Sequence, residues 1–147
     1  MNVKIKNLGI TKYQDTWLAM KNFISSNPDH DEIWITEHYP IYTVGLNKKG
    51  LVLPKNKDIE FLYVDRGGKI TYHGPGQLII YTMINTKKYS FNIRQLVTIL
   101  EQSVVHLLKK IGVESFTKND APGVYLSLIH ISEPTRLLSI SYAVFCV

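Results

Sequence analysis

The chain has 147 residues, of which 45% are hydrophobic and 20% are charged, and its formal net charge is +5. This length suits one domain with its own core, and this composition excludes a disordered protein. No apolar run reaches the roughly 20 residues of a membrane-spanning helix, and the N-terminal residues lack the apolar stretch of a secretory signal. The single cysteine, Cys146, excludes an internal disulfide. We therefore expect a soluble, cytoplasmic protein that does not contact a membrane.

The positive charge comes mostly from lysines, which are spread along the chain with adjacent pairs at 48–49, 87–88 and 109–110. A dispersed excess is typical of a solvated surface, whereas a patch formed on folding would attract an acidic partner. The sequence shows no basic stripe with interleaved aromatic residues, which a nucleic-acid-binding protein would favour. An acidic protein partner is therefore favoured over nucleic acid.

Alternating hydrophobicity predicts a strand over residues 2–10, and residues 32–38 and 40–45 predict two more. Between them, Thr11 to Gln14 has the pattern of a capping box, in which the threonine hydroxyl and the glutamine side chain satisfy free amides at a helix start. The predicted helix places four apolar side chains on one side: Tyr13, Trp17, Met20 and Ile24.

In the second half of the chain, strands are predicted at 59–65 and 77–85, with a glycine-rich segment joining them. The most regular helical pattern covers residues 91–111 and ends before Gly112, in the usual place for a glycine. Its apolar side chains form a stripe that we expect to be buried: Ile93, Leu96, Val97, Leu100, Val104, Leu107, Leu108 and Ile111. Residues 113–117 predict another strand, and 119–125 turn toward one more. The fold class is therefore α+β, with a mixed, largely antiparallel sheet backed by two helices.

The glycine-rich segment, residues 66–77, reads RGGKITYHGPGQ and contains four glycines and three basic residues. Glycine lets a ligand approach the backbone, and successive bare amides can hold an anion or a carbonyl oxygen. Arg66 could bind a carboxylate or phosphate, Lys69 offers a point charge, and His73 could carry a proton or donate a hydrogen bond. The structural alternative is a twisted loop in which His73 belongs to the core. The segment is not a P-loop, because it lacks the GxxxxGK[ST] pattern and leads into a strand.

The stretch RGGKITYHGPGQL closely resembles the signature of the octanoyltransferases of protein lipoylation. The segment TEHYPIYTVG, residues 36–45, resembles a second segment of these enzymes, and APGVY, residues 121–125, resembles a third that follows a long helix. These motifs stand in the right order and cover nearly all of residues 1–125. The resemblance implies a biotin/lipoate protein ligase-like catalytic domain that is truncated at its C-terminus.

The resemblance also implies an apolar acyl pocket whose thioester end lies near Tyr72 and His73. The substrate-binding residues that it implies are Arg66, Gly67, Gly68, Lys69, Ile70, Thr71, Tyr72 and His73. The supporting residues that it implies are Glu37, His38, Tyr42, Gly74, Gly76 and Gln77. Tyr42 and Tyr72 are candidate walls of the pocket or ordinary core residues, and we expect Glu37 and His38 to brace the glycine-rich segment.

The activity implied is the transfer of octanoyl from octanoyl-acyl carrier protein to a lysine of lipoyl domains, in 2-oxoacid dehydrogenase complexes and in the glycine cleavage H protein. It proceeds through a cysteine thioester and needs no metal or cofactor. The cysteine and an activating lysine of this family lie beyond the Pro-Gly-Val segment, yet no lysine follows Tyr125, and Cys146 lacks the expected Pro-Cys-Gly context. We therefore assign no catalytic residue and expect the chain as written to be inactive. Two alternatives stay open: an ATP-dependent lipoate–protein ligase, although the Arg-Arg and triple glycine usual in those enzymes are absent, and a non-catalytic module that binds an acyl group or its carrier protein.

The last residues, 126–147, differ in character from the rest of the chain. LSLIHISEPTR followed by ISYAVFC resembles the translation of a sequencing-library adapter. We therefore expect an incomplete domain at 1–125 and a non-native read-through tail at 126–147. The alternative is a genuine pair of C-terminal strands, because Ile, Val, Tyr and Phe favour β-structure.

Overall fold

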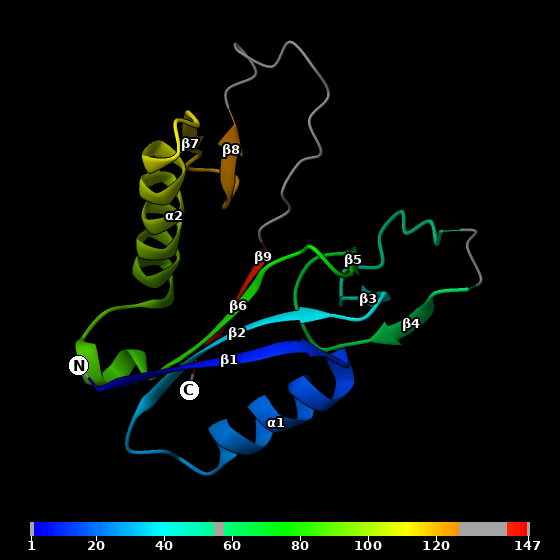
Figure 1. The fold of residues 1–147 in the computed structure, drawn as a ribbon, viewed down its shortest axis with the longest axis horizontal. Helices are drawn as coiled ribbons and strands as arrows, with labels where there is room; N and C mark the ends of the chain where they lie inside the picture. The colour runs from blue at the N-terminus through cyan, green and yellow to red at the C-terminus, as the bar shows by residue number, and fades with distance from the viewer. Residues whose placement is uncertain (1, 55–57, 127–140, 147) are drawn as a thin grey trace. The chain divides into compact units, whose positions relative to one another are not determined.

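The computed structural model describes residues 2–54, 58–126 and 141–146 (Figure 1). Its elements follow in chain order: β1 (Val3–Thr11), α1 (Tyr13–Ser25), β2 (Asp31–His38), β3 (Ile41–Val44), β4 (Glu60–Tyr63), β5 (Ile70–His73), β6 (Ile79–Ile84), the 3-10 helix η1 (Thr86–Tyr89), α2 (Ile93–Lys110), β7 (Ser115–Thr117), β8 (Val124–Leu126) and β9 (Ser141–Cys146). The predicted α+β class is confirmed, with both parallel and antiparallel strand pairs. In the part of the chain described, no helix has the length and hydropathy to cross a membrane.

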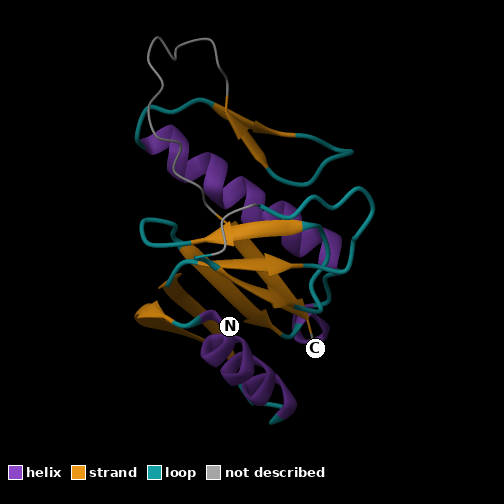
Figure 2. Ribbon diagram, turned by 90° about the vertical axis from the view of Figure 1, so that its right-hand side faces the viewer, coloured by secondary structure: helices purple, strands orange, loops and turns teal. Residues whose placement is uncertain are grey.

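The chain divides into two compact units, one built mainly from residues up to Ile84 and the other mainly from Asn85 onward. The first unit contains a four-stranded sheet of order β1-β2-β6-β9. Helix α1 lies along one face of this sheet (Figures 1 and 2). Its Met20 is fully buried against Trp34, Ile79, Tyr81 and Met83, and Trp17 and Ile24 pack beside it. The apolar side predicted for this helix is therefore confirmed.

Strand β9 pairs with β6 at the edge of the same sheet. It belongs to the segment that resembles adapter sequence, and Tyr, Val and Phe favour a strand there whatever the origin of the segment. Leu126, the first residue of that segment, ends β8, and 127–140 and 147 lie outside the described residues.

A second sheet of the first unit has the order β4-β3-β5, so the predicted single sheet is replaced by several. Strand β5 lies inside the glycine-rich segment and pairs antiparallel with β3, from Ile41 opposite His73 to Val44 opposite Ile70. The structural alternative, a twisted loop over the segment, is therefore wrong in its centre, although His73 is buried as that alternative expects. The four residues Ile-Thr-Tyr-His give too short an alternation to be recognised between glycines.

The helix starts differ from the sequence prediction. Helix α1 has Lys12 at its N-cap and no capping side chain, because Thr11 belongs to β1 and its hydroxyl hydrogen-bonds the side chains of Thr36 and His38. The capping box predicted at Thr11 is therefore wrong. A capping box does occur at α2, where the side chain of Asn92 accepts from the amide of Gln95 and the Gln95 side chain accepts from the amide of Asn92.

The second unit consists of η1, α2 and the antiparallel pair of β7 and β8. Leu96 of α2 is buried, and Glu101 accepts a hydrogen bond from the amide of Gly123, in the APGVY segment. Three members of the predicted buried stripe are exposed instead, namely Ile93, Leu107 and Ile111. Within this unit, two strands of three residues each are too short to cover the whole length of the helix.

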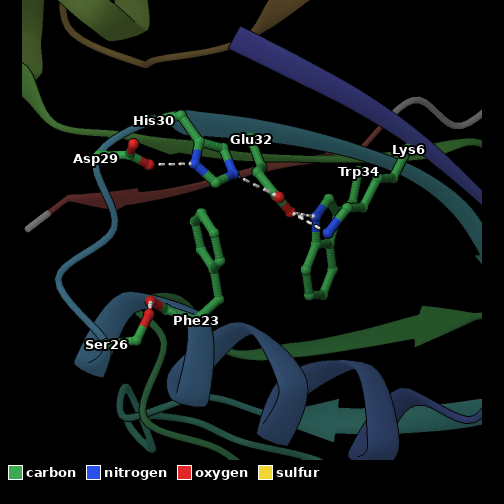
Figure 3. A network of polar contacts seen from close by, with 7 residues as sticks. All are labelled: Lys6, Phe23, Ser26, Asp29, His30, Glu32 and Trp34. Atoms are coloured by element: carbon green, nitrogen blue, oxygen red, sulfur yellow. Dashed lines mark hydrogen bonds and ion pairs between the residues drawn. The ribbon is translucent and has the colours of Figure 1, made fainter. Parts of the chain in front are cut away.

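Strands β1 and β2 run parallel and are joined by a polar network as well as by their backbones (Figure 3). The Nζ of Lys6 lies 2.7 Å from Oε2 of the buried Glu32, and the indole of Trp34 donates to the same oxygen at 2.6 Å. His30 lies between the two carboxylates of Asp29 and Glu32, at 2.7 and 3.0 Å. Burial acts to raise the pKa of Glu32, but the hydrogen bonds from Lys6, Trp34 and His30 together lower it. The network thus keeps Glu32 charged and fixes the register of this strand pair.

This network makes the stability of the first unit depend on pH. Hydrogen bonds to Asp29 and then to Glu32 raise the pKa of His30 above that of an unfolded histidine, about 6.5. The stabilisation is therefore complete below that pH and is lost as the pH rises through the higher folded-state pKa. In thermal unfolding, we expect His30→Gln to lower the melting temperature at about pH 5.5 and to have a smaller effect at about pH 8.5. His106→Gln, on an exposed position of α2, is the matched control. An equal difference in melting temperature between the wild type and His30→Gln at the two pH values would contradict this role.

Candidate functional site

The first half of the glycine-rich segment is held against the end of β3 by backbone hydrogen bonds. The amides of Gly45, Leu46 and Asn47 donate to the carbonyl oxygens of Lys69, Arg66 and Gly68, at 2.9, 3.0 and 3.0 Å. A Cβ at position 45 would lie 2.5 to 2.9 Å from three backbone oxygens, those of residues 66–68. No side chain fits into that space, so Gly45 is required for this close approach of two backbones.

Arg66 anchors the same loop through its side chain. Its Nη2 donates to the carbonyl and hydroxyl oxygens of Thr43, both at 2.8 Å, and its Nε donates to the same hydroxyl at 3.2 Å. Its Nη1 donates to the carbonyl of Gly67 at 2.8 Å. Most of the donor capacity of this guanidinium is therefore directed at its own protein. The geometry makes Arg66 a brace of the loop, and a ligand would have to share or displace these hydrogen bonds.

His73 lies on the inner face of the small sheet and is buried. Its Nε2 is 3.1 Å from the hydroxyl of Thr43, and its Nδ1 is 2.9 Å from Oε1 of Gln77. Burial, above all, lowers the pKa of His73 to about 4, so the ring is neutral at pH 7. A consistent donor pattern places the ring proton on Nδ1, which donates to Gln77, while Nε2 accepts from Thr43. Arg66, Thr43, His73 and Gln77 thus form one connected chain of hydrogen bonds.

Glu37 and His38 are neighbours in β2 whose side chains contact different parts of the first unit. Oε2 of Glu37 accepts from the amide of Gly76 at 2.7 Å, which holds the Gly-Pro-Gly turn. His38 is fully buried, with Nε2 at 2.8 Å from the hydroxyl of Tyr81 and Nδ1 at 3.1 Å from that of Thr11. Burial lowers the pKa of His38. The Glu37 contact fits the bracing that the sequence analysis expects. His38 instead bonds β1 and β6, and it approaches the segment only through its ring, 6.0 Å from that of His73.

A second buried tyrosine joins the two histidines. The ring of Tyr13, at the start of α1, lies 5.0 Å from the ring of His38 and stacks on that of His73 at 5.4 Å. Burial raises the pKa of Tyr13 and of Tyr81. The interior below the glycine-rich segment is therefore lined by neutral aromatic groups that can donate and accept hydrogen bonds.

The outer face of the small sheet carries a row of aromatic side chains. Tyr42 of β3 stacks on Phe61 of β4 with ring centroids 5.0 Å apart, and it lies 5.3 Å from Tyr72 of β5. The three residues are direct cross-strand partners, and Tyr72 is 46% exposed. A Cβ on Gly74 would collide with the ring of Tyr72, so this glycine makes room for it. The sequence analysis does not name Phe61; the strand it predicts over 59–65 is the signal that could have found it.

The remaining predicted site residues are spread over the segment. Gly67, Gly68 and Lys69 lie exposed on the loop, and Ile70 and Thr71 are half-buried in β5. The APGVY segment belongs to the second unit and is not placed relative to these residues. Among the described residues, no three His, Cys, Asp or Glu side chains are arranged to hold a metal ion.

Comparison with known proteins gives this geometry a context. Residues 12–133 match the family model of the lipoyl protein ligase A/B catalytic domain. A protein of Shewanella piezotolerans described as octanoyltransferase is 44% identical over 124 residues, which cover 83% of this chain and 56% of the relative. One of Buchnera aphidicola, with the same description, is 46% identical over 125 residues, which cover 84% of the chain and 59% of the relative. The chain thus spans less than two thirds of the length of either relative.

A similar fold is found in a solved structure of a T. acidophilum protein provisionally described as a lipoate protein ligase. The TM-score is 0.61 at 17% identity, and the match covers 92% of this chain and 55% of the other. This likeness confirms the predicted fold, and the family match covers most of the chain. The chain belongs to the lipoyl protein ligase A/B catalytic domain family.

Proposed function

We propose that the chain supplies the acyl-binding part of an octanoyltransferase, which moves octanoyl from octanoyl-acyl carrier protein to a lysine of a lipoyl domain. Two relatives described as octanoyltransferase, at 44% and 46% identity, support this assignment. They also favour it over the ATP-dependent ligase, the alternative that the sequence left open.

The observation that carries the proposal is the way the loop 66–69 is built. Its backbone lies against β3 at Gly45, its arginine is turned inward to Thr43, and Gly67 and Gly68 present bare, exposed backbone. Glycine permits an acyl thioester to lie directly against such a backbone. The aromatic row of Tyr72, Tyr42 and Phe61 begins in the next strand, and it offers an apolar surface to an acyl chain.

The proposed reaction needs two groups that we do not assign to any residue up to Tyr125. A cysteine thiolate attacks the thioester carbon and the carrier leaves as its thiolate. The neutral acceptor amine then attacks the new thioester, an amide forms, the enzyme thiolate is released, and the proton of the amine passes to the thiolate of the carrier or to solvent. The thiolate is the reactive form, so a nearby positive group must lower the pKa of the thiol. We therefore propose that the sequence as written binds the acyl thioester without transferring its acyl group.

The loop geometry predicts how two glycine substitutions act on binding. Gly45→Ala forces the loop 66–69 away from β3, because the added Cβ meets three backbone oxygens. Gly67→Ala leaves the loop in place, since a Cβ there has no neighbouring atom within 4 Å, but it covers backbone on which we propose that the thioester lies. In a titration with octanoyl-pantetheine, we expect each variant to weaken binding by about tenfold, and amide hydrogen exchange at the loop to rise in Gly45→Ala alone. Wild-type affinity in either variant, with both folded by circular dichroism, would contradict the proposed binding surface.

Because we assign no nucleophile up to Tyr125, a transfer assay tests the proposal. With octanoyl-acyl carrier protein and a lipoyl domain, we expect mass spectrometry to find no octanoylated lysine, both for the wild-type sequence and for Cys146→Ala. Adding ATP and free octanoate should not change this result, because the proposed donor is a thioester. Turnover that survives Cys146→Ala would place the nucleophile elsewhere in the chain. Turnover that requires ATP would support the ligase alternative.

A further inference from the structure

Six residues in and beside the loop 66–69 form an exposed surface that combines apolar and positive side chains. We call it the lysine–tyrosine face, and its members are Leu46, Lys48, Lys49, Val52, Tyr63 and Lys69. Leu46 is 68% exposed, Val52 is 83% exposed and Tyr63 is 59% exposed. Single apolar residues on a surface are normal, but several together commonly mark an interaction site.

Contacts within the first unit bring Leu46, Lys48, Tyr63 and Lys69 together, and Lys49 and Val52 follow in the same segment, which turns where the amide of Leu51 donates to the carbonyl of Lys48. The amides of Leu46 and Asn47 donate to carbonyl oxygens of the loop 66–69, so the segment after β3 lies along that loop, next to Lys69. The Nζ of Lys48 lies 5.7 Å from the ring centre of Tyr63, at the end of β4. The face is therefore continuous with the loop that we propose to hold the acyl thioester.

The positive charge of this face is directed to solvent. Lys48, Lys49 and Lys69 are exposed, and none of them forms an ion pair with another described residue. The carboxylate that precedes the loop, Asp65, is already paired with Lys21 at 2.7 Å. Unpaired lysines around exposed apolar side chains fit a partner that presents carboxylates around an apolar patch.

We propose that the lysine–tyrosine face docks the acidic acyl carrier protein that delivers the acyl thioester. This inference rests on the proposed function and adds to it the place where the donor binds. The donor is favoured over the acceptor domain because the thioester has to reach the glycine-rich loop first, and the face adjoins that loop. Charge attraction of this kind acts mainly on the rate of association and is weakened by salt.

The test titrates octanoyl-acyl carrier protein against the full chain by fluorescence anisotropy, at low salt and at about 0.5 M salt. We expect Lys48→Glu with Lys49→Glu to weaken binding at low salt by at least about tenfold. Lys87→Glu with Lys88→Glu, in η1 of the second unit, is the matched control with the same change of charge and should retain affinity within about twofold. Leu46→Gln with Val52→Gln should weaken binding at both salt concentrations, whereas Ile5→Gln, equally exposed on β1, should not.

A parallel titration with octanoyl-pantetheine, which has no protein surface, separates this inference from the proposed function. If the carrier binds the charge-reversed variant with the same affinity as the wild type, the docking site is elsewhere and the proposed function stands. Binding of octanoyl-pantetheine without binding of the carrier also overturns the docking proposal alone. If neither ligand binds, the proposed function fails as well. If only a lipoyl domain loses affinity on charge reversal, the face belongs to the acceptor and the proposal is wrong.

Discussion

The carbonyl and hydroxyl oxygens of Thr43 both accept hydrogen bonds from the guanidinium of Arg66. The remainder of the candidate site depends on this contact. A partly buried charged group must be hydrogen-bonded, since each lost bond to a charged group costs about 1.5–3 kcal/mol. The contact fixes the loop 66–69 on β3, and the backbone bonds to residues 45–47 extend it. The same hydroxyl hydrogen-bonds His73, so the side chain of Thr43 contacts both the loop and the inner face of β5 and holds them in position.

Below this contact, the interior is polar but uncharged. His38 and His73 are buried and both have a lowered pKa, and the pKa values of Tyr13 and Tyr81 are raised. Each of these shifts favours the neutral form of its group. A neutral, hydrogen-bonded interior can support a glycine-rich loop without the cost of burying unpaired charges. The basic groups that remain exposed, such as Lys69 and Lys48, are then available to partners in solution.

The sequence predicts elements well where a regular pattern of apolar side chains extends over many residues. It predicts poorly where a contact between distant residues determines the position of a side chain. Alternation found β1, β2 and β6, and helical spacing found the buried side of α1. The pattern does not reveal β5, because four residues between glycines are too few to show a recognisable alternation. The residue type of Arg66 suggests a ligand-binding group, but its inward orientation depends on Thr43, 23 residues away. The sequence around Thr11 suggests a helix cap, but its hydroxyl hydrogen-bonds Thr36 and His38, which only the folded sheet brings near. The motifs themselves identified the family.

The central claim is that the hydroxyl of Thr43, by accepting hydrogen bonds from Arg66, holds the glycine-rich loop in place. Amide hydrogen exchange of Thr43→Val tests it most directly, because valine keeps the shape of threonine and removes the hydroxyl. The account predicts faster exchange at the amides of Gly45, Leu46 and Asn47, which donate to the loop, with unchanged exchange in the β2–β6 pair. Unchanged protection at these three amides would contradict it, because the loop would then be held without the Thr43 hydroxyl.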